Sequence, residues 1–173
     1  MLKFVSVIKM NLPKRKPTRL KNYDYSQNGA YFITICTHNK KCILSNIVGE
    51  GLCALPSIQL TPIGETVDKA IKYIDQNYQN VFVDKYVIMP NHIHLIVKIE
   101  TGGHGDPPLQ AYDIIGNFKS FTTHEYKNTL WQRSFHDHII RGDDDYLKIL
   151  EYIDLNPQKW KEDCFYTEQI KAE

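Results

Sequence analysis

The stretch from Val81 to Ile99 constrains the fold of this chain more than any other part of the sequence. Residues 81–89 and 92–99 are both rich in β-branched and aromatic side chains, and only Pro90 and Asn91 separate the two runs. Proline and asparagine interrupt strands and favour turns, so this pattern predicts a β-hairpin. We therefore expect an antiparallel sheet.

The second run has two different faces. Successive side chains of a strand point to opposite sides, so the apolar residues at 93, 95, 97 and 99 share one face, which is expected to pack in the core. His92 and His94 share the other face with Ile96 and Lys98. Two imidazoles at this spacing are close enough to bind one divalent metal ion. The alternative is a pair of ordinary polar residues on a solvated strand face.

The other elements are predicted from periodicity and from residues that begin or end helices. The sequence predicts a strand at 30–37, a helix capped by Thr61 and opened by Pro62, a helix with Ile114, Phe118 and Phe121 on its apolar face, an extended segment at 131–140, and a helix from 143 to about 155. The order of strand, helix, hairpin, helix, strand and helix favours a single α/β (α+β) domain with the helices over one face of the sheet.

The last helix carries a tyrosine that packing does not require. Its apolar stripe consists of residues 146, 149, 150 and 153, whereas Tyr152 and Asn156 project elsewhere. Because these two residues are four apart, they lie one above the other, and a site that contains the phenol also contains the amide. The alternative for Tyr152 is packing at the rim of the core.

Other histidines are weaker candidates for a metal site. His136 and His138 form a second His-x-His pattern, but Asp137 lies on the opposite face, so the two faces are less distinct. His38, His104 and His124 each stand alone. We therefore rank His92 and His94 first.

Charge is distributed unevenly along the chain. The net charge is only +1, but the first 21 residues carry seven Lys or Arg and no acid. A basic arm of this kind can bind phosphates, or it can simply keep the protein soluble. The four cysteines form no CxxC pair, and no apolar stretch is long enough to cross a membrane, so we expect reduced cysteines and a cytoplasmic location.

Four blocks of this sequence resemble the single-tyrosine transposases, and most closely the REP-associated tyrosine transposase group. The blocks follow one another along the chain in the same order as in that family. The residues 90–97 resemble the family's HUH motif of two histidines around a hydrophobic residue. The resemblance extends from about Pro13 to Trp160. The other three blocks are NYDYSQNGAYF at 22–32, LWQRSF at 130–135 and YIDLNP at 152–157.

The resemblance implies a ferredoxin-like or RRM-like antiparallel sheet and a metal-dependent endonuclease and strand transferase that acts on single-stranded, hairpin-associated DNA. By this resemblance His92 and His94 bind Mg²⁺ or Mn²⁺, Asn156 is the third ligand, and Tyr152 is the nucleophile that forms a 5′-phosphotyrosine. A phenol is a weak nucleophile at neutral pH and needs such activation. Relatives include monomers and helix-exchanged homodimers, so the resemblance leaves open which subunit's histidines Tyr152 serves.

The resemblance also divides the chain into a basic arm at 1–21, the catalytic domain at 22–160 and a C-terminal tail at 161–173. Two groups of side chains are candidates for DNA contact. One consists of basic and aromatic side chains in and near the arm, and the other of polar side chains off the apolar face of the second helix. The DNA-binding candidates are Lys14, Arg15, Lys16, Arg19, Lys21, Tyr23, Tyr25, Lys119, Ser120, His124, Arg133 and Arg141.

Two other functions remain open from the sequence. A histidine-triad nucleotide hydrolase also uses alternating histidines on a strand, but it requires a third histidine where this chain has Ile96. A DNA- or RNA-binding module with this fold but without catalysis is the other possibility, although the presence of both histidines and Tyr152 disfavours it.

Overall fold

The computed structural model describes residues 28–49, 56–100 and 111–167. Its centre is a four-stranded antiparallel sheet in the order β4-β5-β1-β6. Among the strands of this sheet, β1 is the first along the chain and β5 the third, and these two lie in the middle. This is the ferredoxin-like arrangement. The strands are β1 (Gly29–Cys36), β4 (Val81–Ile88), β5 (His92–Ile99) and β6 (His136–Ile140).

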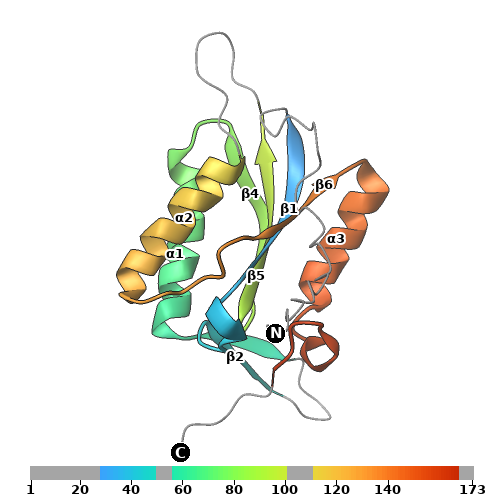
Figure 1. Ribbon diagram of the computed structural model, residues 1–173. Coiled ribbons are helices and arrows are strands. Elements are labelled where there is room, and N and C mark those ends of the chain that lie inside the picture. Colours follow the sequence, from blue (N-terminus) through green and yellow to red (C-terminus); the bar gives the residue numbers. More distant parts are fainter. Residues whose placement is uncertain (1–27, 50–55, 101–110, 168–173) are drawn as a thin grey trace, which may run out of the picture.

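Helices cover both faces of this sheet (Figure 1). Helices α1 (Pro62–Asn77) and α2 (Ala111–Tyr126) lie on one face, and α3 (Asp143–Leu155) lies on the other. The predicted α+β class with an antiparallel sheet is therefore confirmed. The prediction that the helices share one face holds for α1 and α2 and is wrong for α3.

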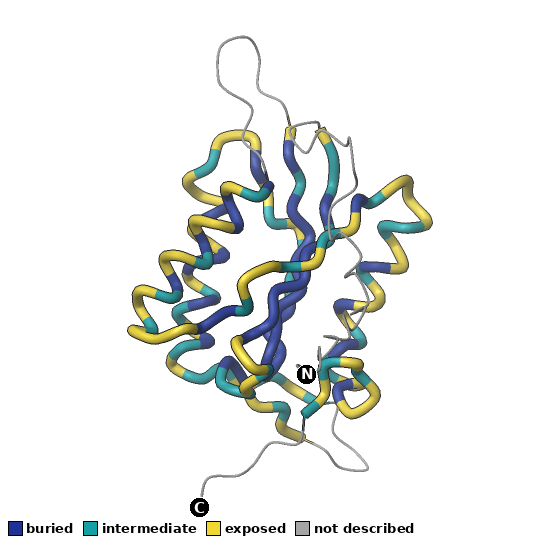
Figure 2. Tube along the Cα trace, in the orientation of Figure 1, coloured by how far each residue is buried: buried dark blue, intermediate teal, exposed yellow. Residues whose placement is uncertain are grey.

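The two faces of the sheet form two hydrophobic cores of different size. The face of β5 that carries Ile93 and Leu95 packs under α1 and α2, and this larger core also contains Tyr31 of β1. The opposite face contributes Ile96 to a smaller core with Ile149 and Ile153 of α3. Because both faces are covered, the central strands are buried along most of their length (Figure 2). The histidine face is thus an interior face.

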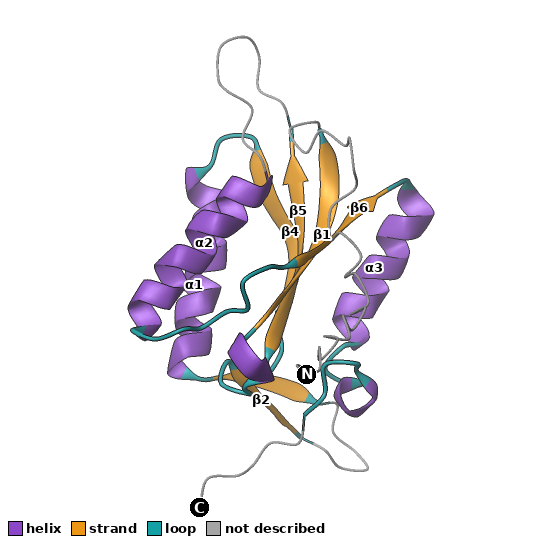
Figure 3. Ribbon diagram, in the orientation of Figure 1, coloured by secondary structure: helices purple, strands orange, loops and turns teal. Residues whose placement is uncertain are grey.

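Smaller elements close one end of the sheet (Figure 3). Strands β2 (Ser45–Val48) and β3 (Ser57–Leu60) form a separate two-stranded sheet, and η1 (His38–Lys40) and η2 (Trp160–Glu162) are short 3₁₀ turns. One sequence assignment is corrected here: Phe121 of α2 was expected on the apolar face, but it is 54% exposed. None of the helices in the described ranges has the length and apolar character needed to cross a membrane.

The N-terminus of α1 is fixed by a close contact with the chain before β2. As predicted, Thr61 caps this helix, and its hydroxyl oxygen accepts a hydrogen bond from the Gly64 amide at 3.1 Å. The Thr61 amide in turn donates to the Leu44 carbonyl oxygen at 3.0 Å. A Cβ atom on Gly64 would lie only 1.9 Å from that same carbonyl oxygen. The close approach therefore requires glycine at position 64.

We expect Gly64→Ala to lower the free energy of unfolding by about 3 kcal/mol, because the added methyl group overlaps backbone that cannot move without breaking the cap. Urea unfolding followed by circular dichroism measures this change. Gly116→Ala is the matched control, since a Cβ at this position in α2 meets nothing within 4 Å. Alanine is the better helix former, so the control should be neutral or more stable by up to about 1 kcal/mol. Equal effects of the two substitutions would contradict the close contact.

Candidate active site

Strand β5 places His92 and His94 side by side inside the protein. The two ring centroids are 4.5 Å apart, and the residues are 0% and 1% exposed. They point toward α3 and the segment that follows it, as the alternation of the strand predicts. The interpretation of these histidines as polar residues on a solvated face is therefore wrong, because α3 and the residues after it cover them.

Asn91 determines which ring nitrogen of His92 carries the proton. The Asn91 side-chain carbonyl oxygen lies 2.9 Å from Nδ1 of His92 and can only accept a hydrogen bond. Nδ1 is therefore the donor, and Nε2 keeps a free lone pair. This Nε2 atom is buried and has no hydrogen-bond partner. A buried nitrogen with an unused lone pair is an available metal ligand.

His94 is held by a neighbouring strand in a similar way. Its Nδ1 lies 2.8 Å from the hydroxyl of Thr34, the residue directly opposite in β1. Phe32, on the same face of β1, stacks on the His94 ring with a centroid distance of 5.2 Å. These contacts leave Nε2 pointing toward α3, where it lies 3.3 Å from the hydroxyl of Tyr152.

Burial keeps both imidazoles neutral. It lowers the pKa of His92 to about 3, with a further decrease from the nearby positive charge of Lys40. Burial also lowers the pKa of His94 to about 3, and a proton on the adjacent His92 would disfavour a second proton on His94. A metal ion binds only the deprotonated imidazole. At neutral pH neither histidine has to lose a proton before it can coordinate.

Tyr152 reaches this site from α3 of the same chain. Besides its apolar core, α3 is tied to β4 by an ion pair between Lys85 and Asp154 at 2.6 Å and by a hydrogen bond from Tyr146 to Asp84. Tyr152 is 41% exposed, so its hydroxyl group lies between the buried histidines and solvent. In this arrangement the phenol lies beside the His94 of its own chain.

The surroundings of Tyr152 hold its hydroxyl in the protonated form. Partial burial raises the pKa of Tyr152 to about 12, and the negative charge of Asp163 contributes to the increase. The hydroxyl is 3.5 Å from a carboxylate oxygen of Asp163. These groups alone therefore make the phenol a poorer nucleophile, and a positive charge at the site would be needed to reverse this effect.

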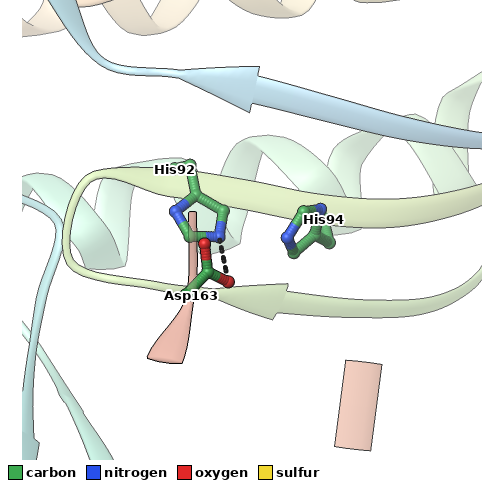
Figure 4. Close-up of side chains that lie close together, drawn as sticks. All are labelled: His92, His94 and Asp163. Atoms are coloured by element: carbon green, nitrogen blue, oxygen red, sulfur yellow. Dashed lines mark ion pairs between the residues drawn. The ribbon is translucent and has the colours of Figure 1, made fainter. Parts of the chain in front are cut away.

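Asp163 is a site residue that the sequence did not indicate. Its carboxylate lies 4.0 Å from Nε2 of His92, and one ligand atom from each of His92, His94 and Asp163 lies within 4.8 Å of the other two (Figure 4). Asp163 is in the stretch 161–173 that the sequence assigned to a tail, seven residues beyond Asn156 and outside any recognised ligand spacing. Its preceding turn, η2, folds back over the histidines.

Asn156 also joins the site, one helical turn after Tyr152. Its amide nitrogen donates to the Asp163 carboxylate at 3.0 Å. Its carbonyl oxygen is buried without a hydrogen-bond partner, and the residue is 2% exposed. As predicted, Tyr152 and Asn156 lie on the same side of the helix, and both line a cleft of about 480 Å³ that also includes Lys148 and Lys159.

The donor atoms fit a divalent metal ion. Two neutral imidazoles and a carboxylate converge, Asn156 contacts that carboxylate, and buried atoms of His92 and Asn156 have no hydrogen-bond partner. Such a mixed nitrogen and oxygen set suits Mn²⁺, and its oxygen atoms suit Mg²⁺. The second histidine pattern is different, since His136 is exposed and His138 binds Asp145 at 2.8 Å.

Among the described residues, the fold does not bring the predicted DNA-binding candidates together at one place. Lys119, Ser120 and His124 lie on α2, across the sheet from Tyr152 (Figure 1). The Lys119 ammonium group donates to the carbonyl oxygens of Gln132 and Arg133, so it holds the segment before β6. Outside the described residues lie the candidates Lys14, Arg15, Lys16, Arg19, Lys21, Tyr23 and Tyr25, as well as His104.

Arg133 and Arg141 lie at either end of the segment that contains β6. Both side chains are exposed, and neither belongs to the group formed by the two histidines and Asp163. Their assignment to DNA contact stays a prediction.

Comparisons with known proteins point to one group. The chain is 35% identical to an uncharacterized protein of Haemophilus influenzae, over 89% of this chain and 94% of that protein. It is 26% identical to a protein of the same organism named as a REP-associated tyrosine transposase, over 81% of this chain and 77% of that one. No family model matches the sequence.

A solved structure shares the fold. The structure of a REP-associated tyrosine transposase bound to a REP hairpin superposes with a TM-score of 0.58 at 21% identity, over 82% of this chain and 73% of the other. At this identity the likeness concerns the fold.

Proposed function

We propose that this chain, which belongs to the family of the REP-associated tyrosine transposases, is a metal-dependent nuclease that cleaves and rejoins single-stranded DNA. The observation that carries the proposal is the position of the Tyr152 hydroxyl, 3.3 Å from Nε2 of a buried, neutral histidine. The Tyr152 ring packs edge-on against Phe32, with ring centroids 6.0 Å apart, and this contact helps to hold the phenol beside His94. The site combines a nucleophile with a set of metal ligands.

Tyr152 is proposed as the nucleophile. Its phenol oxygen attacks a phosphodiester phosphorus, the bond from phosphorus to the 3′ oxygen breaks, and that oxygen leaves as a 3′-hydroxyl after gaining a proton. The phenol proton passes to water, which reaches Tyr152 because the residue is 41% exposed. The product is a 5′-phosphotyrosine. The phosphorus remains a diester, now bonded to the Tyr152 oxygen and the 5′ oxygen, so a 3′-hydroxyl of another strand can attack it, release the tyrosine and join the strands.

His92, His94 and Asp163 are proposed to hold the metal ion, with Asn156 as an additional ligand through its unpaired carbonyl oxygen. When bound, Mg²⁺ or Mn²⁺ supplies positive charge that stabilises the phenolate and the developing charge on the phosphate. Asn91 and Thr34 orient the two histidine rings. Lys148 and Lys159, which line the same cleft, are positioned to neutralise the phosphates of the strand.

Hairpin-bearing single-stranded DNA is the proposed substrate, by analogy with the relative whose structure contains a REP hairpin. The geometry supports a site in which Tyr152 acts with the histidines of its own subunit, since α3 packs on the sheet of the same chain. A homodimer and the basic arm's contact with DNA stay predictions. A histidine-triad hydrolase is disfavoured, because Ile96 occupies the third position and is fully buried against α3.

The experiment is an adduct assay. A pool of single-stranded hairpins with randomised flanking bases is labelled at the 3′ end, because the fragment that stays on the protein carries the original 3′ end. With Mn²⁺ we expect a labelled band that migrates with the protein on a denaturing gel. EDTA should decrease this band at least about 100-fold, and excess Mn²⁺ should restore it. Binding of the pool without any adduct would instead support a catalytically inactive binding module, and an adduct insensitive to EDTA would contradict the metal's role.

A further inference from the structure

We infer that Asn91 is a positioning residue that joins two parts of the metal site, because it orients His92 and also holds the segment that carries Asp163. This inference rests on the metal site proposed above. The sequence assigned Asn91 only to the hairpin turn, but its side chain is completely buried and uses both ends of its amide.

The oxygen end of the amide acts on His92. The 2.9 Å contact with Nδ1 leaves the metal-facing Nε2 with its lone pair, as described above. A hydrogen-bond partner on the ring nitrogen that does not bind the metal fixes both the tautomer and the rotation of a ligating imidazole. Loss of such a partner typically weakens metal binding by about 10-fold to 100-fold.

The nitrogen end of the amide acts on the segment after η2. It donates to the Phe165 carbonyl oxygen at 2.8 Å and to the Thr167 hydroxyl at 3.2 Å. The Phe165 amide nitrogen is itself 2.6 Å from a carboxylate oxygen of Asp163. One continuous set of hydrogen bonds therefore runs from Asn91 through Phe165 to Asp163. The ring of Phe165 also packs against His92, with centroids 4.7 Å apart.

Only an amide side chain can both accept a hydrogen bond from His92 and donate one to the Phe165 carbonyl oxygen. A carboxylate at position 91 would still accept the proton of His92, but it would repel the Phe165 carbonyl oxygen. A leucine of similar size would do neither. The substitutions Asn91→Asp and Asn91→Leu thus separate the orientation of His92 from the docking of the segment.

Docking of the segment is measured by hydrogen exchange, without any metal or DNA. We expect Asn91→Asp to accelerate exchange of a peptide covering 160–167 by at least about 10-fold, while peptides of β1 and α1 keep their protection. Asn46→Asp is the matched control, since Asn46 is exposed in β2 and should leave all peptides unchanged. Thr167→Val removes one acceptor of the Asn91 amide at a half-buried position and should accelerate the same peptide with intact folding.

Calorimetric titration with Mn²⁺ tests the connection to the ligands. Asp163→Asn should weaken Mn²⁺ binding at least about 10-fold in the wild-type background, but less than about 2-fold in the Asn91→Asp background, where the carboxylate is already displaced. Asn91→Leu should weaken binding more than Asn91→Asp, because it also frees the His92 ring. A role of Asn91 in stability alone would not produce this dependence on Asp163.

Two results would overturn the inference. One is unchanged exchange of the 160–167 peptide in both Asn91→Asp and Thr167→Val. The other is an equal effect of Asp163→Asn in both backgrounds. Failure of the wild-type protein to bind Mn²⁺ is a different outcome, because it would overturn the proposed metal site itself.

Discussion

Replacing Tyr152 by phenylalanine will decrease formation of the covalent protein–DNA adduct by at least about 1000-fold, while binding of the same DNA changes little. The substitution removes one oxygen atom and no packing surface. Because that oxygen is the proposed nucleophile, no neighbouring group can replace it in the attack. The hydroxyl makes only long contacts to His94 and Asp163, at 3.3 and 3.5 Å, so its loss should not disturb the fold.

The control for this experiment is Tyr73→Phe. Tyr73 is an exposed tyrosine on α1, on the other side of the sheet, and it loses the same atom. Its adduct yield should match that of the wild type. An adduct that persists in Tyr152→Phe but is lost in a different tyrosine variant would show that another phenol is the nucleophile.

Replacing His92 by alanine will weaken Mn²⁺ binding by more than about 100-fold. His92 contributes the buried Nε2 atom without a hydrogen-bond partner, which in the apo protein is an uncompensated polar group. Removing a residue that binds the metal directly should weaken metal affinity more than the roughly 10-fold to 100-fold that is typical when a residue hydrogen-bonded to a ligand is removed. Calorimetric titration of the folded variant with Mn²⁺ measures this effect, and circular dichroism confirms that the variant is folded.

His136→Ala is the matched control, since His136 begins the second His-x-His pattern and is exposed on the edge strand β6. It should bind Mn²⁺ as the wild type does. If His136→Ala weakened binding as much as His92→Ala, the metal would have to be assigned to the β6 pattern. If neither variant changed the affinity, coordination of Mn²⁺ by His92 would be ruled out.

Much of the site was predictable because strands and helices repeat with fixed periods. The alternation of residues 92–99 placed both histidines on one face, and the spacing of Tyr152 and Asn156 placed them on one side of a helix. These relations depend only on local backbone geometry. For the same reason Thr61 and Pro62 marked the start of α1 correctly.

Asp163 and Asn91 were missed for the opposite reason. Asn91 and Phe165 are 74 residues apart in sequence, and no period connects them. Nothing in the immediate neighbourhood of Asp163 distinguishes it from the other acids near the C-terminal end. Its role follows from the return of the chain after α3, which places η2 and Phe165 over the histidines.

The sequence by itself predicted the strands of the central sheet, the three helices and their order, and it singled out His92, His94 and Tyr152 as candidates for the chemistry. Only the tertiary structure decided that α3 crosses to the histidine face, that the histidines are buried and neutral, and that Asp163 lies beside them. The physical reason is that a helix covers whichever sheet face offers matching apolar surface. Here Ile96, an apolar residue on the histidine face, packs with Ile149 and Ile153, and this contact brings Tyr152 to His94.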